Sequence, residues 1–122
     1  MPKILIIEDE TSIRENLRRF LRLEGYTVLE AADGLSGAAL AGEENPDLIL
    51  CDVMMPGCDG FAVLEKLQSH PETRHLRLLF LSASAEKERL EQALALGALG
   101  YVTKPFVLTE LLAVIRQHLD KA

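Results

Sequence analysis

The chain lacks the residues and segments that mark several classes of protein. Its 122 residues contain no tryptophan, only two cysteines, and 13 lysine and arginine residues against 19 aspartate and glutamate residues, which gives a net charge of −6. The shortage of basic residues argues against nucleic-acid binding as the main activity, because such affinity depends on clustered lysine and arginine. Neither a repeat nor a low-complexity linker divides the sequence, so its length predicts one globular domain.

Long hydrophobic runs are also missing. The first apolar stretch, residues 1–7, ends at the acidic segment Glu8–Glu10, whereas a membrane-spanning helix needs about 20 consecutive apolar residues. We therefore expect a cytoplasmic protein that does not bind a membrane. The two cysteines, Cys51 and Cys58, match neither a disulfide framework nor a zinc site, which predicts reduced thiols that contribute to packing.

Short apolar runs alternate with longer segments of helical periodicity. Five runs are predicted strands: Ile4–Ile7, Tyr26–Ala31, Leu48–Cys51, Leu78–Leu81 and Leu99–Val102. Five segments are predicted helices, at about residues 12–24, 35–44, 60–68, 85–96 and 108–120. Several runs are apolar at consecutive positions, as in a parallel sheet with helices on both faces. The fold class is therefore α/β, with an open, doubly wound sheet.

The signals for individual helices differ in strength. Ser12 and Glu15 have the spacing of a capping box, and Gly25 occupies the position of a left-handed C-cap after the first helix. The second predicted helix contains Gly37 and Gly42, each of which lowers helix propensity by about 1 kcal/mol relative to alanine. Of the five predicted helices, the second therefore has the weakest support from its sequence.

Acidic residues follow two of the predicted strands, at the edge where open α/β sheets bind ligands. Glu8, Asp9 and Glu10 follow the first strand, and Asp52 follows the third. If these two strands are neighbours, Glu8, Asp9 and Asp52 converge in one shallow pocket. Three carboxylates within about 4 Å repel one another by about 4 kcal/mol per pair at an effective dielectric constant of 20.

A divalent cation would remove this repulsion. Oxygen ligands alone favour Mg²⁺ or Mn²⁺ over Zn²⁺, and Cys51 should face the opposite side of its strand from Asp52. The alternative is structural, because Glu8, Asp9 and Glu10 would also place negative charge at the N-terminus of the first helix, where the helix dipole favours it.

Two further polar residues, Ser82 and Lys104, follow the fourth and fifth strands at the same edge. Lys104 could extend its ammonium group across the pocket to the carboxylates or to a phosphoryl group, and a cis bond to Pro105 would aim it there. Ser82 offers a hydroxyl donor, although capping of the next helix is an alternative role.

Four segments, in the expected order and spacing, resemble the receiver domain of two-component response regulators, including its single-domain chemotaxis members. They are Lys3–Glu10, Pro46–Gly60, Leu81–Ala83 and Gly97–Phe106. The likeness covers essentially the whole chain and implies one receiver domain, residues 1–122. It implies a flavodoxin-like (βα)5 fold with strand order 2-1-3-4-5, and any output function would lie on another chain or beyond Ala122.

By this resemblance Asp52 is the phosphoacceptor, which takes a phosphoryl group from a phosphohistidine of a sensor histidine kinase or a phosphotransfer protein. Mg²⁺ would be held by Asp9, Asp52 and the carbonyl of Met54, with Glu8 acting through water. The resemblance implies a phosphorelay switch whose only chemistry is self-phosphorylation and self-dephosphorylation, not a turnover enzyme.

The resemblance also assigns the switch to Ser82 and Tyr101. Ser82 and Lys104 would each contact a phosphoryl oxygen, and Tyr101 would turn inward as Ser82 moves, which remodels the surface of the fourth helix, fifth strand and fifth helix for an unidentified partner. Two such bonds of about 1.5–3 kcal/mol each are of the order of the roughly 5.5 kcal/mol that inverts a 1:99 equilibrium. Met54 and Ser84 are expected to control access of water, and the bulky Met54 predicts slow self-dephosphorylation.

One feature of the family is not expected in this chain. Gly100 and Val114 stand where many DNA-binding regulators carry the Asp and Arg of an intersubunit ion pair, so the dimer that this ion pair joins is not expected.

Three other functions are alternatives to a phosphorylated receiver. An aspartyl-phosphate phosphatase would need Asp-x-Asp, whereas Met54 stands two residues after Asp52. A flavin-binding domain would need a Ser, Thr and Gly-rich phosphate loop where Glu8–Glu10 stand. A degenerate receiver would bind partners without phosphorylation, although every expected reactive position is filled.

Overall fold

Five parallel strands form one sheet with helices on both of its faces, in a computed structural model that describes residues 2–83 and 87–119. The strands are β1 (Lys3–Ile7), β2 (Thr27–Ala31), β3 (Leu48–Asp52), β4 (Leu78–Ser82) and β5 (Gly100–Thr103), and the helices are α1 (Thr11–Leu23), α2 (Gly34–Glu44), α3 (Gly60–Gln68), α4 (Lys87–Ala95) and α5 (Leu108–Leu119). The strand order β2-β1-β3-β4-β5 confirms the predicted doubly wound α/β fold.

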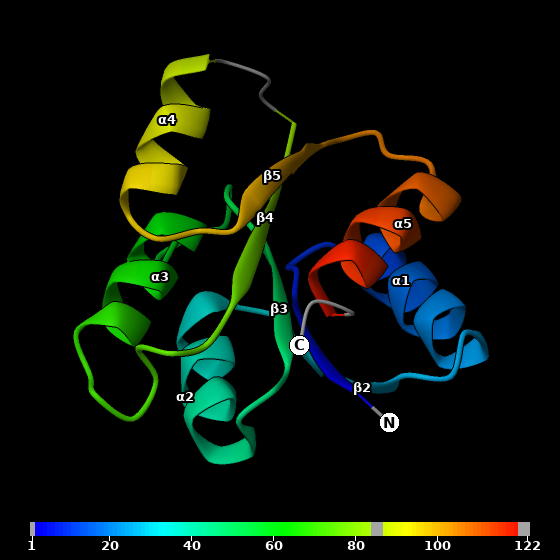
Figure 1. Ribbon diagram of the computed structural model, residues 1–122, viewed down its shortest axis with the longest axis horizontal. Helices are drawn as coiled ribbons and strands as arrows, with labels where there is room; N and C mark the ends of the chain where they lie inside the picture. Colours follow the sequence, from blue (N-terminus) through cyan, green and yellow to red (C-terminus); the bar gives the residue numbers. More distant parts are fainter. Residues whose placement is uncertain (1, 84–86, 120–122) are drawn as a thin grey trace.

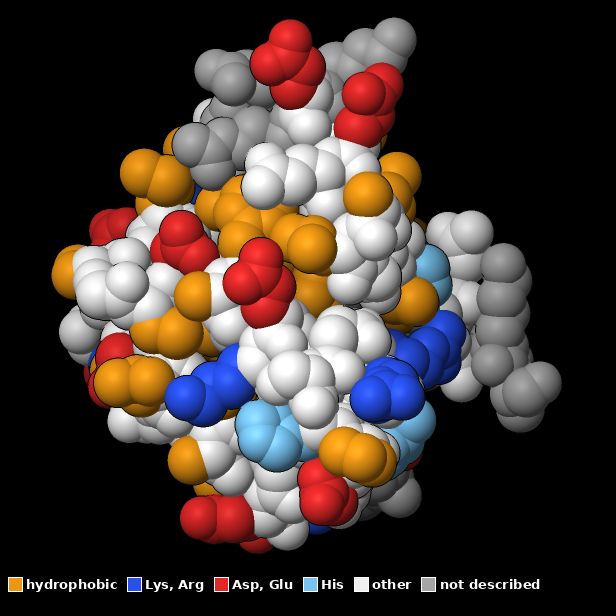
Figure 2. Space-filling view, turned by 90° about the vertical axis from the view of Figure 1, so that its left-hand side faces the viewer, with side chains coloured by type: hydrophobic (Ala, Val, Ile, Leu, Met, Phe, Trp, Pro, Cys, Tyr) orange, Lys and Arg blue, Asp and Glu red, His pale blue; other side chains and the backbone are white. Residues whose placement is uncertain are grey.

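The helices divide between the two faces of the sheet. Helices α1 and α5 lie on one face, and α2, α3 and α4 lie on the other (Figure 1). On the second face, hydrophobic side chains gather in one area and basic and histidine side chains lie below it (Figure 2). Within the described ranges, no helix is long and apolar enough to cross a membrane.

The strands are buried on both sides, as their consecutive apolar residues predict. Leu5 and Ile7 contribute to the core under α2 and α3, whereas Ile4 and Ile6 contribute to the core under α1 and α5. All four side chains are 0% exposed. Cys51 lies in the first of these two cores as a free thiol, which agrees with the predicted packing role.

Helix α1 lies within one residue of its predicted bounds, but its predicted N-cap, Ser12, was wrong, whereas its predicted C-cap signal at Gly25 is confirmed. The N-cap is Glu10, which makes no side-chain cap hydrogen bond, and Ser12 lies inside the first turn with its hydroxyl donating to Glu10 at 3.3 Å. The helix starts earlier because the Arg14 amide already donates to the Glu10 carbonyl. At the other end, Gly25 has φ +96° and Tyr26 donates to the carbonyl of Leu21, a Schellman motif.

The other helices follow the predicted bounds within a few residues. Helix α2 forms despite its glycines because Asp33 caps it, accepting from the Ser36 amide at 2.8 Å, and because its small residues Ala38 and Ala41 are buried. The predicted beginning of α4 and the predicted last residue of α5, Asp120, fall outside the described residues.

Helix α3 begins against the end of β3. A Cβ atom at Gly60 would lie 2.5 Å from the carbonyl oxygen of Asp52 and 2.9 Å from Cα of Val53, and the Gly60 amide donates to the Val53 carbonyl at 2.9 Å. The contact requires a residue without a side chain, and it joins the first turn of α3 to the strand that carries Asp52.

Candidate functional site

The structure brings the three predicted carboxylates together. Because β1 and β3 are neighbours, with Ile7 paired to Cys51, the residues that end these strands lie at one edge of the sheet. One oxygen each from Glu8, Asp9 and Asp52 lies within 4.8 Å of the others. Glu8 is 0% exposed and Asp52 is 5% exposed, whereas Asp9 is exposed to solvent.

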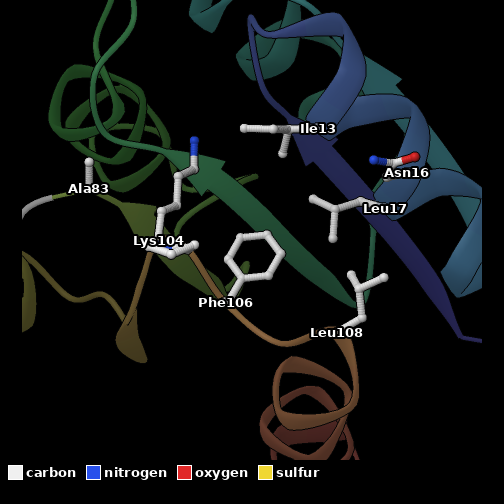
Figure 3. Close-up of a pocket in the computed structure, with 8 residues that line it drawn as sticks. Ile13, Asn16, Leu17, Ala83, Lys104, Phe106 and Leu108 are labelled. Atoms are coloured by element: carbon white, nitrogen blue, oxygen red, sulfur yellow. The ribbon is translucent and has the colours of Figure 1, made fainter.

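Lys104 reaches the same site from the loop after β5. Its Nζ lies 2.6 Å from Oε1 of Glu8 and 3.3 Å from Oδ1 of Asp52, and the Lys104–Pro105 bond is cis, as expected. Figure 3 shows the lysine side chain extending toward the end of β3. The ammonium group therefore neutralises part of the negative charge that converges there.

Burial sets the protonation of the site. Burial, opposed by the hydrogen bond from Lys104 and reinforced by the charge of Asp52, raises the pKa of Glu8 from 4.5 to about 7. Burial is the largest single effect on Lys104 and lowers its pKa, but the hydrogen bonds and negative charges of Glu8 and Asp52 together outweigh burial, so the pKa of Lys104 is raised. One cation thus offsets the repulsion between the buried carboxylates only in part.

The donor set fits a divalent cation that prefers oxygen. Three carboxylates lie within reach of one ion, and the exposed Asp9 leaves one side open for the water ligands that Mg²⁺ retains. Cys51 is buried in the core instead, so its thiol does not compete. The alternative role, negative charge at the N-terminus of the first helix, is filled by only one of the three acidic residues: Glu10 is the N-cap residue of α1.

Ser82 and Tyr101 lie on the strands next to this edge. Ser82 is the last residue of β4, 1% exposed, and its carbonyl accepts from the backbone amide of Lys104 at 2.6 Å. Tyr101 is half-buried in β5, opposite Phe80 of β4. Met54, two residues after Asp52, is 64% exposed, whereas Ser84 falls outside the described residues.

Two features of the site escaped sequence reasoning. The guanidinium group of Arg14 donates to the carbonyl oxygen of Glu8 at 2.7 Å, a contact that its position one turn after Glu10 only weakly suggests. A cavity of about 380 Å³ also opens beside Lys104 (Figure 3). Its lining comes from separate segments of the chain: Ile13, Asn16, Leu17, Ala83, Lys104, Pro105, Phe106 and Leu108.

Known sequences share this plan. A family model described as response regulator receiver domain matches residues 4–116. The chain is 40% identical over 121 residues to the DNA-binding dual master transcriptional regulator RpaA of Synechocystis sp., covering 99% of this chain and 50% of RpaA. It is 33% identical over 117 residues to sporulation initiation phosphotransferase F of Bacillus subtilis, covering 96% and 93% of the two chains. The chain spans about half the length of several curated relatives, RpaA among them.

Solved structures agree with the sequence matches. Chemotaxis protein CheY4 of Vibrio cholerae has a TM-score of 0.92 and 32% identity, covering 98% of this chain and 99% of CheY4. The receiver domain of sensor histidine kinase PA1611 of Pseudomonas aeruginosa, solved with a magnesium ion coordinated in its active site cleft, has a TM-score of 0.89 and 28% identity over 98% of each chain. The chain belongs to the response regulator receiver domain family.

Proposed function

We propose that this chain is a phosphoryl-accepting switch in which Asp52 is the phosphoacceptor. A carboxylate oxygen of Asp52 forms a bond to the phosphorus of a phosphohistidine on a sensor histidine kinase or phosphotransfer protein. The bond from phosphorus to the imidazole nitrogen breaks, and its electron pair stays on the imidazole, which takes up a proton from water. The observation that carries this proposal is the convergence of Glu8, Asp9, Asp52 and Lys104 at one edge of the sheet.

The residues around Asp52 are suited to this transfer. Asp9, Asp52 and the carbonyl of Met54 would hold Mg²⁺ (or Mn²⁺), with Glu8 acting through water, and the ion would neutralise the oxygens of the transferred group. Asp52 itself is held in place by β3, because the Val53 amide after it donates to the Leu81 carbonyl of β4 at 3.0 Å. Such positioning is the main contribution of a protein to phosphoryl transfer.

Lys104 and Ser82 supply the remaining contacts in this proposal. Lys104 already pairs with Asp52 before phosphorylation, so its ammonium group stays within reach of a phosphoryl oxygen added there. Ser82 donates to a second oxygen, and Tyr101 moves into the space that Ser82 leaves. Two bonds of about 1.5–3 kcal/mol each are enough to shift a two-state surface appreciably.

The output of the switch is altered binding at the surface of α4, β5 and α5. The partner is an unidentified output domain or a separate protein: the match covers 50% of RpaA but 93% of sporulation initiation phosphotransferase F, so both arrangements occur among relatives. The domain itself is not expected to bind nucleic acid, because its net charge is −6. It undergoes self-phosphorylation and self-dephosphorylation and is not a turnover enzyme.

An intact-mass experiment tests the proposal. Wild type, Asp52→Asn and Asp59→Asn are incubated with phosphoramidate and Mg²⁺, with Mg²⁺ binding measured in parallel. Asp59 is a matched control, because its side chain caps α3 by accepting from the Ala62 amide and asparagine retains that acceptor. An adduct of about 80 Da is expected on wild type and Asp59→Asn but not on Asp52→Asn.

The other outcomes are equally informative. An adduct on Asp52→Asn would show that another residue is the phosphoacceptor. The absence of an adduct from all three proteins, with Mg²⁺ bound, would favour a degenerate receiver that binds partners without phosphorylation.

A further inference from the structure

Arg14, near the start of α1, contacts the backbone of the acidic site. Its Nη1 donates to the carbonyl oxygen of Glu8 at 2.7 Å, and its Nε lies 3.9 Å from the carboxylate of Glu30 in β2. The Arg14 side chain is only 14% exposed. Arg18 pairs with the same Glu30 carboxylate at 3.0 Å, which holds Glu30 from one helical turn further along α1.

Glu8 is consequently fixed through each of its polar groups. Its amide donates to the Ala31 carbonyl of β2 at 3.1 Å, its side chain accepts from Lys104 and from the Glu10 amide, and its carbonyl accepts from Arg14. Asp9 differs, because within the described part of the chain no protein group holds its exposed carboxylate. The direction of Asp9 therefore depends on the peptide bond that joins it to Glu8.

We propose that Arg14 is a positioning residue that aims the carboxylate of Asp9 at the metal site by holding the Glu8 carbonyl. This inference rests on the proposed function, since it assumes that Asp9 binds Mg²⁺. Groups that orient metal ligands from outside the coordination sphere change metal affinity by about 10- to 100-fold when they are removed.

The sign of the effect separates positioning from simple electrostatics. Arg14 carries a positive charge close to a cation site, so its charge alone opposes the binding of Mg²⁺. If Arg14 acted only through charge, its removal would strengthen Mg²⁺ binding. If it positions Asp9, its removal weakens Mg²⁺ binding despite the lost repulsion.

The experiment measures Mg²⁺ affinity by calorimetry, at a pH where Glu8 is ionised, for wild type, Arg14→Met, Arg14→Lys and Arg18→Met. We expect Arg14→Met to weaken binding by about 10-fold. Arg14→Lys should restore part of the affinity, because an ammonium group can donate to the Glu8 carbonyl but lacks the second arm toward Glu30. Arg18→Met removes the same charge from the same ion-pair group without touching Glu8, and should leave affinity unchanged or slightly stronger.

Amide resonances provide a second measurement on the metal-free proteins. The signals of Asp9 and Glu10 should shift in Arg14→Met and stay in place in Arg18→Met. If wild type binds Mg²⁺ and Arg14→Met binds it equally or more tightly, the inference is overturned and the proposed function stands. If wild type binds no Mg²⁺ and accepts no phosphoryl group, the proposed function fails. Should Arg14→Met not fold, Arg14→Ala takes its place, since it also removes the donor to the Glu8 carbonyl; weaker Mg²⁺ binding than wild type would support the inference, and equal or tighter binding would overturn it.

Discussion

The interior of the sheet and its carboxyl edge are equally buried and chemically opposite. Residues Ile4–Ile7 of β1 are all apolar and 0% exposed, and the next residue, Glu8, is a carboxylate that is also 0% exposed. In β3, the buried Cys51 is followed by Asp52 at 5% exposure. Burial of an aliphatic side chain stabilises a fold by about 1.5–3 kcal/mol, whereas burial of an ionised carboxylate costs several kcal/mol unless it is paired.

The two regions of a strand therefore contribute to different properties of the domain. The apolar interior stabilises the fold. The carboxylates buried at the edge do not stabilise it, and their presence there is explained by the proposed chemistry. Lys104 offsets part of the repulsion between Glu8 and Asp52. The pKa of Glu8 is nevertheless raised, which shows that its buried charge is not fully compensated. Substitutions in the two regions should therefore have opposite consequences for stability and for phosphorylation.

The largest effect is expected from Asp52→Asn, which removes a carboxylate from the edge of the sheet and leaves the apolar interior unchanged. Phosphorylation is expected to be lost completely, while the free energy of unfolding stays the same or rises, because a buried charge that repels Glu8 is gone. Urea denaturation of the metal-free protein measures the second quantity. A marked loss of stability would show that Asp52 contributes to the fold as well as to the site.

The converse substitution is Leu50→Ala, in a fully buried residue of β3. The lost apolar area and the resulting cavity should lower the free energy of unfolding by about 2–5 kcal/mol. Phosphoramidate should still modify the fraction that remains folded, since Asp52 keeps its place. A stable but unreactive variant would contradict the separation of the two regions.

Changes in pH should affect the edge selectively. Below about pH 7 Glu8 binds a proton that Mg²⁺ binding must displace, so Mg²⁺ affinity should fall with decreasing pH. In the metal-free protein the folded state binds more protons than the unfolded state between pH 4.5 and about 7, so stability should fall as pH rises through that window. Glu8→Gln should flatten both profiles, measured by calorimetry and urea denaturation. Identical slopes in the two proteins would assign the titration to another group.

The smallest effect concerns the lifetime of the phosphorylated state. Met54 stands two residues after Asp52 and is 64% exposed, and we expect its bulky apolar side chain to hinder the approach of water to the phosphoryl group. Met54→Asn should therefore lose the phosphoryl group several-fold faster, followed by intact mass after removal of the donor. Equal decay rates would mean that Met54 does not control access of water.

The sheet and the acidic site were predictable because they depend on pattern and topology. Consecutive apolar residues in β1 and β3 indicate strands buried on both faces, and parallel strands bring Glu8 and Asp52 to one edge whatever the side-chain details. The role of Ser12 and the contact of Arg14 with Glu8 were not predictable in this way. They depend on where α1 begins relative to β1, which is set by contacts across the fold and not by the local spacing of Ser12 and Glu15.

The contact of Gly60 with Asp52 also limits how this domain can vary. Any larger residue at position 60 would force apart the first turn of α3 and the backbone of Asp52. In a library that randomises position 60, selection for phosphorylation should therefore return glycine alone, while exposed positions of α3 such as Glu65 and Lys66 accept many residues. In variants of this domain, phosphorylation of Asp52 thus depends on Gly60, a residue that has no side chain and takes no part in the reaction.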